Sequence, residues 1–205
     1  MEMKSEEPRK LDLIRRFVPS CENVLDLAAG DGVYLPHLAR KGKRVVALEI
    51  SRDLCDVIKG RGFQPVMAHA WFLPFREDAF DCVWASEIIE HLPTLDTFGE
   101  MERVAKGNIV VTMPNPWSPH YERDPTHVLK YTLFSLAGFL RRRAGYSQWR
   151  YRMRGLGFYW IPGPGFFKRL TKYATYYLPW LSPTISITGR STRGIPGGAG
   201  GKDAL

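Results

Sequence analysis

Residues 23–32, NVLDLAAGDG, decide the fold, because a short apolar run leads directly into a turn rich in alanine and glycine. The run 23–27 predicts a buried strand, and Tyr34, Leu35 and Leu38 recur at helical spacing in a helix expected to reach Gly42. A strand, a glycine turn and a helix in this order bring bare backbone to the carboxyl edge of a parallel sheet. Open α/β sheets bind their ligands at that edge.

The chain on either side of this unit continues the alternation of helices and strands. An N-terminal helix is expected through Leu11, Ile14 and Val18, and a second helix capped by Ser51 is expected to end at Gly60. Further strands are expected at 44–50, 65–68, 80–85 and 108–113, with a helix at 95–105 between the last two. The pattern predicts a single-domain, doubly wound α/β protein with a Rossmann-like, mostly parallel sheet.

The last third of the chain is basic and rich in aromatic residues. A helix capped by Thr132 is expected to end at Gly145, and residues 149–154 alternate aromatic or apolar side chains with arginines, as a strand does. A helix at 166–177 and an antiparallel strand at 184–188 would complete a seven-stranded sheet. The domain is therefore predicted to span 1–188, with a basic, aromatic-rich portion at 116–188 and a disordered, glycine-rich tail at 189–205.

Composition excludes several classes of protein. The 205 residues are 44% hydrophobic and 24% charged, which is typical of a soluble domain and not of a disordered chain. The N-terminus carries charges where a signal peptide needs an apolar run, and the cysteine spacing matches neither a disulfide framework nor a metal motif. We therefore expect a cytoplasmic protein. Residues 125–202 contain no acid, so the positive charge is concentrated in the C-terminal third.

The glycine turn favours one class of nucleotide ligand. A dinucleotide fingerprint needs a third glycine or alanine where Leu35 or Val33 stands, so NAD is disfavoured. Asp26 and Asp31 flank the turn and would repel a diphosphate, whereas they suit the ammonium and sulfonium of S-adenosylmethionine. Glu49, at the end of the second strand, is placed to accept hydrogen bonds from two ribose hydroxyls, as in dinucleotide folds.

Five segments in register resemble the class I S-adenosylmethionine-dependent methyltransferases. They are VLDLAAGDG (24–32), LPFREDAFDCV (73–83), SEIIEHL (86–92), EMERV (100–104) and VTMPN (111–115), and the resemblance covers about residues 20–130. It implies a methyltransferase of class EC 2.1.1.- that takes S-adenosylmethionine as its cofactor. The cofactor-binding positions that it implies are Asp26, Ala28, Gly30, Gly32, Glu49, Ile50, His69, Ala70, Trp71, Ser86 and Glu87.

Two of these positions depart from the family pattern. The family usually has glycine where Ala28 stands, and we expect the alanine to cost little if its φ is negative. The family usually has an aspartate that contacts the adenine amine where His69 stands. A neutral imidazole can accept from that amine or stack on the ring, or His69 can be an incidental surface residue beside Trp71.

The loop 115–127 holds the candidate catalytic residues. His120, Tyr121, Asp124 and His127 combine bases, an acid and an aromatic ring at the expected ligand edge, and His127 or His120 is the expected base. Asp124 or His127 can equally pin the loop to backbone. No metal is expected, because Glu87, Glu90 and His91 match neither HExxH nor HxxEH.

The sequence leaves several classes of methyl acceptor open. The resemblance favours a small-molecule or lipid-like, possibly anionic acceptor. The alternating arginines Arg150, Arg152 and Arg154 also suit RNA or an anionic membrane surface. A third reading, suggested by Ala28 and His69, is an adaptor that binds the cofactor without catalysis.

Overall fold

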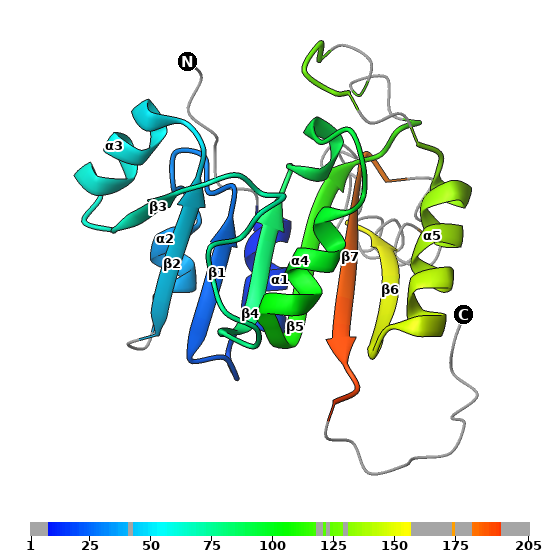
Figure 1. Ribbon diagram of the computed structural model, residues 1–205. Helices are drawn as coiled ribbons and strands as arrows, with labels where there is room; N and C mark the ends of the chain where they lie inside the picture. Colours follow the sequence, from blue (N-terminus) through cyan, green and yellow to red (C-terminus); the bar gives the residue numbers. More distant parts are fainter. Residues whose placement is uncertain are drawn as a thin grey trace, which may run out of the picture.

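The computed structural model describes residues 8–40, 43–117, 121, 124–128, 131–156, 174 and 182–193. Its centre is a seven-stranded sheet with the order β3-β2-β1-β4-β5-β7-β6 (Figure 1). All neighbouring pairs are parallel except those of β7, which runs antiparallel to both β5 and β6. The predicted Rossmann-like sheet with one antiparallel C-terminal strand is confirmed.

The elements follow the predicted order. The strands are β1 (Asn23–Leu27), β2 (Arg44–Glu49), β3 (Pro65–Met67), β4 (Phe80–Ser86), β5 (Ala105–Pro114), β6 (Trp149–Gly155) and β7 (Thr184–Ser191). The helices are α1 (Pro8–Phe17), α2 (Leu35–Leu38), α3 (Arg52–Gly60), α4 (Thr97–Val104) and α5 (Leu133–Tyr146), with a 3₁₀ turn, η2 (Ile89–His91). Ser51 caps α3 and Thr132 caps α5 through their side chains, as the sequence predicts.

Alternating residues of the central strands build a core on each face of the sheet. Val24, Cys82 and Trp84 pack with Leu13 and Ile14 of α1. Leu25, Val83 and Ile109, together with other residues of the same faces, pack with α4 and α5, which lie in front of the sheet in Figure 1. Side chains of successive strand residues point to opposite faces, so a strand covered on both sides reads as a continuous apolar run.

Two boundaries differ from the sequence-based expectation. The predicted helix reaching Gly42 is reduced to the four residues of α2, whose second position is Pro36. Strand β7 extends through Gly189 to Ser191, three residues past the expected end of the domain, because its pairing with β5 and β6 continues to Arg190 and Ser191. Apart from Ala174, the predicted helix at 166–177 lies outside the described residues, as does the tail from 194.

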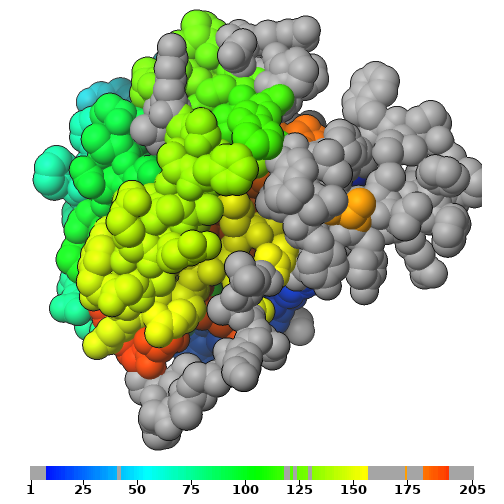
Figure 2. Space-filling view, turned by 90° about the vertical axis from the view of Figure 1, so that its right-hand side faces the viewer, coloured from blue at the N-terminus to red at the C-terminus, as the bar shows by residue number. Residues whose placement is uncertain are grey.

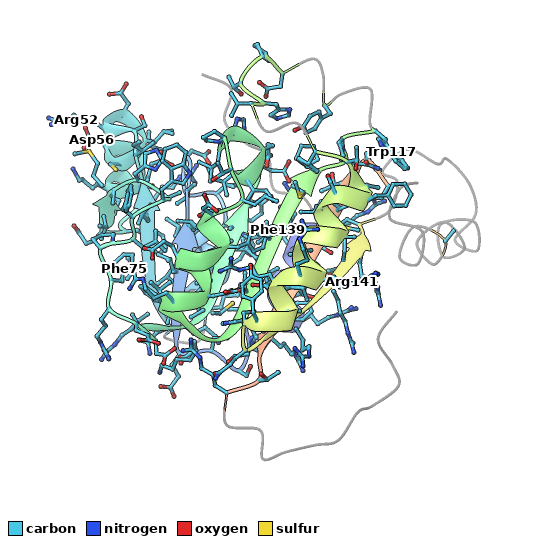
Figure 3. The ribbon with its side chains drawn as sticks, turned by 45° about the vertical axis from the view of Figure 1, so that its right-hand side comes forward. Arg52, Asp56, Phe75, Trp117, Phe139 and Arg141 are labelled. Atoms are coloured by element: carbon cyan, nitrogen blue, oxygen red, sulfur yellow. The ribbon has the colours of Figure 1, made fainter. Side chains whose placement is uncertain are left out.

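At the β6 end of the sheet, a buried carboxylate joins α4 to α5 and β6. Glu102 accepts from Arg143 Nε and Nη2 at 2.8 and 2.7 Å and from the Tyr151 hydroxyl at 2.6 Å. Phe139 of α5 packs edge-on against Phe98 of α4 at 5.6 Å, whereas Arg141 points away from the sheet (Figure 3). Figure 2 shows α5 and β6 at the outer face of this end.

Within the described part of the chain, no helix has the length and apolar character needed to cross a membrane.

Candidate cofactor and acceptor site

The turn after β1 has an unusual backbone that depends on small residues. Ala28, Gly30 and Gly32 all have positive φ, at 57, 61 and 77°. A Cβ at Gly32 would lie 2.8 Å from Leu35 Cδ1, whereas nothing lies within 4 Å of a Cβ built at Gly30. Gly32 is therefore required for the packing of the turn, and Gly30 presents open backbone at the carboxyl edge of the sheet.

Ala28 does not meet the condition under which its cost was expected to be small. Its φ of 57° lies in the left-handed region, which costs a residue with a Cβ about 1–2 kcal/mol. The low cost expected for a negative φ therefore does not apply to Ala28. The position needs glycine for the same reason as Gly30 does.

We expect Ala28→Gly to stabilise the protein by about 0.5–1 kcal/mol, since the strain relieved exceeds the added entropy of the unfolded chain. Chemical denaturation measures this change. Ala29→Gly is the matched control, because Ala29 is buried in the turn without positive φ and its replacement is expected to destabilise. A loss of stability in Ala28→Gly equal to that in Ala29→Gly would contradict the strain argument.

Glu49 at the end of β2 is a fixed, buried carboxylate. Its Oε2 accepts from the Gly30 N–H at 2.8 Å, and its Oε1 accepts from the N–H groups of Ile50 and Ser51 at 2.8 and 3.0 Å. Only 5% of Glu49 is exposed, while the next residue, Ile50, is 60% exposed. The carboxylate therefore ties the end of β2 to the glycine turn and holds both in one geometry.

The two aspartates of the turn have different surroundings. Asp26 is buried within β1, between Ala47 of β2 and Trp84 of β4. Asp31 accepts from the Val33 N–H at 3.3 Å and forms an ion pair with Arg61 Nη2 at 3.3 Å. The charge of Asp31 is thus balanced within the chain by Arg61, which reduces the repulsion of a diphosphate expected from this aspartate.

The segment after β3 is organised by His69. Its Nδ1 accepts from the Trp71 N–H at 3.2 Å, and the two rings lie 4.5 Å apart at 40°. An accepting Nδ1 carries no proton, so Nε2 of the neutral ring is a donor and cannot accept from an adenine amine. Of the roles considered for His69, acceptance from the amine does not fit this tautomer, whereas stacking on the ring and an incidental surface position both do. Ala70 beside it is buried, and its carbonyl accepts from Thr97 Oγ1 at 2.9 Å.

At the end of β4, Glu87 is held in a strained conformation by an ion pair. Its φ is 53°, and its Oε1 lies 3.0 Å from Lys10 Nζ and 3.1 Å from Thr112 Oγ1, which is also 3.0 Å from Ser86 Oγ. Backbone strain of this kind is concentrated at functional sites. Lys10 was missed from sequence. Its spacing could have indicated that it is buried, because Lys10 lies on the same face of α1 as Leu13 and Ile14.

The loop after β5 is fastened to η2, directly beyond Glu87. The Val128 N–H donates to the Glu90 carbonyl at 3.0 Å, and His91 Nδ1 lies 3.1 Å from the Thr126 carbonyl. His127 Nδ1 lies 2.8 Å from the Tyr121 carbonyl, and its ring stands 4.6 Å from that of Tyr121. These contacts bring two residues of the loop, Tyr121 and His127, beside Glu90 and His91.

The candidate catalytic residues differ in what they can do. Asp124 accepts from Thr126 N–H and Oγ1 at 2.9 and 2.5 Å, and these bonds lower its pKa, so it is an ionised loop anchor. Burial, with a smaller effect of Glu90, raises the pKa of Tyr121 to about 12, so this phenol is a donor and not a base at neutral pH. His127 can offer Nε2, because its Nδ1 donates to a carbonyl. His120 lies outside the described residues.

The fold also gathers a cluster of metal-ligating side chains. Glu90, His91 and His127 each offer one ligand atom, and these atoms lie within 4.8 Å of one another. The expectation of no metal was based on spacing within residues 87–91. His127 joins that segment only through the loop after β5, 36 positions beyond His91, so local spacing carries no signal of it.

Comparisons with known proteins agree with this architecture. A family model described as a methyltransferase domain matches residues 25–111. A curated methyltransferase, GfsG of Streptomyces halstedii, is 34% identical over 102 residues, which are 45% of this chain and 37% of that protein. A demethylmenaquinone methyltransferase of a Mycobacterium species is 34% identical over 96 residues, 44% of this chain and 40% of its own. The chain thus matches well under half the length of these relatives.

Solved structures extend the likeness to the whole sheet. A crystal structure described as a SAM-dependent methyltransferase from Archaeoglobus fulgidus has a TM-score of 0.61 at 20% identity, over 89% of this chain and 94% of that one. At this identity the likeness concerns the fold. Residues 25–111 are thus similar to a methyltransferase domain, and the whole sheet shares its fold with solved structures of S-adenosylmethionine-dependent methyltransferases.

Proposed function

We propose that this protein transfers a methyl group from S-adenosylmethionine to a small-molecule or lipid-like acceptor. The observation that carries the proposal is the rigid unit of Glu49 and Gly30. A fixed carboxylate at the end of β2 lies 2.8 Å from the amide of an open glycine turn at the end of β1. This unit fits a nucleoside whose ribose contacts Glu49 and whose charged amino acid end lies against the turn.

The residues around this unit suit the other parts of the cofactor. Asp26 places an acidic side chain in β1 just before the turn, and a negative charge there suits a cationic ligand better than an anionic one. Ile50, 60% exposed beside Glu49, and the adjacent rings of His69 and Trp71 offer apolar and ring surfaces for adenine. Ser86 and Glu87 stand at the carboxyl end of β4, the strand next to β1, where they are placed to contact the amino acid end of the cofactor.

S-adenosylmethionine supplies a methyl group that its sulfonium has already activated for in-line displacement. The task left to the chain is to hold the acceptor in line and to exclude water. Tyr121 and His127 stand where η2 meets the loop after β5, and His127 Nε2 is placed to take a proton from a hydroxyl or ammonium acceptor.

Exposed aromatic side chains favour an apolar acceptor. Trp117, just after β5, and Phe134, at the start of α5, are 50% and 75% exposed, and their rings lie 5.9 Å apart. Figure 3 shows Trp117 at the end of α5 that lies nearest this loop. Exposed ring pairs beside a cofactor cleft are suited to the flat or prenylated body of a small molecule.

Transfer of labelled methyl groups tests the proposal. The protein is incubated with S-adenosylmethionine carrying a labelled methyl group and with a cell extract, which is then separated into RNA, protein, lipid and small molecules. We expect label in the lipid or small-molecule fraction. Label in RNA would instead assign the acceptor role to the face with Arg150 and Arg152, both exposed on β6. Binding of the cofactor without label in any fraction would indicate an adaptor.

A further inference from the structure

We propose that Glu90, His91 and His127 bind one divalent transition-metal ion at the acceptor side of the cleft. The three ligand atoms come from η2 and from the loop after β5, and they lie within 4.8 Å of one another, a separation that one ion can bridge. Two imidazoles and one carboxylate are a common ligand set for zinc and for other first-row metals.

Both imidazoles are oriented by backbone, as metal ligands usually are. His127 Nδ1 lies 2.8 Å from the Tyr121 carbonyl, and His91 Nδ1 lies 3.1 Å from the Thr126 carbonyl. Each ring then keeps its proton on Nδ1 and presents the lone pair of Nε2. At metal sites the ring nitrogen that does not bind the metal usually donates to a carbonyl or carboxylate, and this contact fixes the tautomer and the direction of the ring. The two rings lie 5.0 Å apart.

The surroundings of the cluster are acidic, which favours a cation. Glu90 is fully buried, and Glu87 and Asp124 lie in the same region. Burial first, and then the nearby Tyr121, Glu90 and Glu87, raise the pKa of Tyr131. Lys10 Nζ pairs with Glu87 at 3.0 Å. A cation bound by the two histidines also attracts the carboxylate of Glu90.

Three protein ligands leave at least one coordination position for water or for an oxygen of the acceptor. This extension rests on the proposed function. It assigns His127 as a ligand rather than a base, because a single lone pair on Nε2 cannot serve both purposes. The acceptor class that it favours has a hydroxyl or other oxygen donor near the methylated atom.

Binding of Co²⁺ and Zn²⁺ by the full chain tests the metal site. The protein is stripped with a chelator, titrated with each ion by calorimetry, and examined with Co²⁺ for visible absorption bands. We expect one ion per chain. His91→Asn and His127→Asn are each expected to weaken binding about tenfold or more, as is Glu90→Gln. His37→Asn, which removes a histidine of α2, is expected to leave affinity unchanged within about twofold.

The histidine variants keep the test decisive if Glu90→Gln fails to fold, because Glu90 is fully buried and both histidines are partly exposed. Absence of stoichiometric binding by the parent protein overturns the proposal, as does equal binding by His127→Asn and the parent. Titration of the same preparation with S-adenosylmethionine separates the two proposals. Cofactor binding without metal binding rejects the metal site alone, and metal binding without cofactor binding rejects the proposed function alone.

Discussion

Replacing Glu49 by glutamine is expected to weaken the binding of S-adenosylmethionine about 100-fold, which is about 2.7 kcal/mol. The carboxylate is the proposed acceptor for the two ribose hydroxyls, and a hydrogen bond to a charged group contributes about 1.5–3 kcal/mol. Glutamine also turns an NH₂ group toward one of the backbone donors of Gly30, Ile50 and Ser51. Calorimetric titration of parent and variant measures the change.

Asp56→Asn is the matched control for this prediction. It removes one acid from α3, where the Asp56 carboxylate is exposed and pairs with Lys59 at 2.8 Å. Figure 3 shows Asp56 at the outer edge of the molecule. Affinity for the cofactor is expected to stay within about twofold. Thermal unfolding without ligand verifies that Glu49→Gln is folded. A folded variant with the parent's affinity would show that Glu49 does not hold the ribose.

Replacing Glu102 by alanine is expected to lower the free energy of unfolding by about 3–5 kcal/mol. Glu102 is buried and accepts three hydrogen bonds, two from Arg143 and one from Tyr151, so its loss leaves a guanidinium and a phenol without their acceptor. Burial first, and then the bond to Glu102, raises the pKa of Tyr151, so the phenol stays neutral. Chemical denaturation measures the loss, and Tm is expected to fall by about 10 °C.

Asp12→Ala provides the comparison for an exposed pair. Asp12 bonds Arg15 at 3.1 Å within α1, and both side chains are more than half exposed. Its removal is expected to cost less than about 1 kcal/mol. If Glu102→Ala and Asp12→Ala lose equal stability, the contacts of Glu102 with α5 and β6 contribute no more to the free energy of unfolding than a surface ion pair does.

Most of the fold could be predicted from sequence, because burial on both faces leaves a simple pattern. The inner parts of strands β2 and β4, residues 45–48 and 82–85, are apolar from end to end, which is typical of a strand covered by helices on both sides. The ends of the strands were harder to predict. The extension of β7 through Gly189 depends on a partner strand, and Tyr151 of β6 lies against that glycine so closely that a Cβ would come within 2.7 Å of its ring.

The site could be predicted where each residue acts next to its own strand. Gly30 and Glu49 stand at the ends of β1 and β2, and their contact follows from parallel pairing of those strands. The features of the site that could not be predicted depend on backbone angles or on partners that are distant in the sequence. The positive φ of Ala28 and the ion pair of Asp31 with Arg61 are of this kind. His127 likewise meets His91 only because a loop folds back onto η2.

The most direct test of the central claim is a calorimetric titration of the purified chain with S-adenosylmethionine, S-adenosylhomocysteine, NAD and ATP. An account based on Glu49, the open turn at Gly30 and the buried Asp26 predicts saturable binding of the first two ligands at one site per chain. It predicts no binding of NAD or ATP at the same concentrations. Binding of NAD or ATP without binding of either adenosyl compound would contradict it.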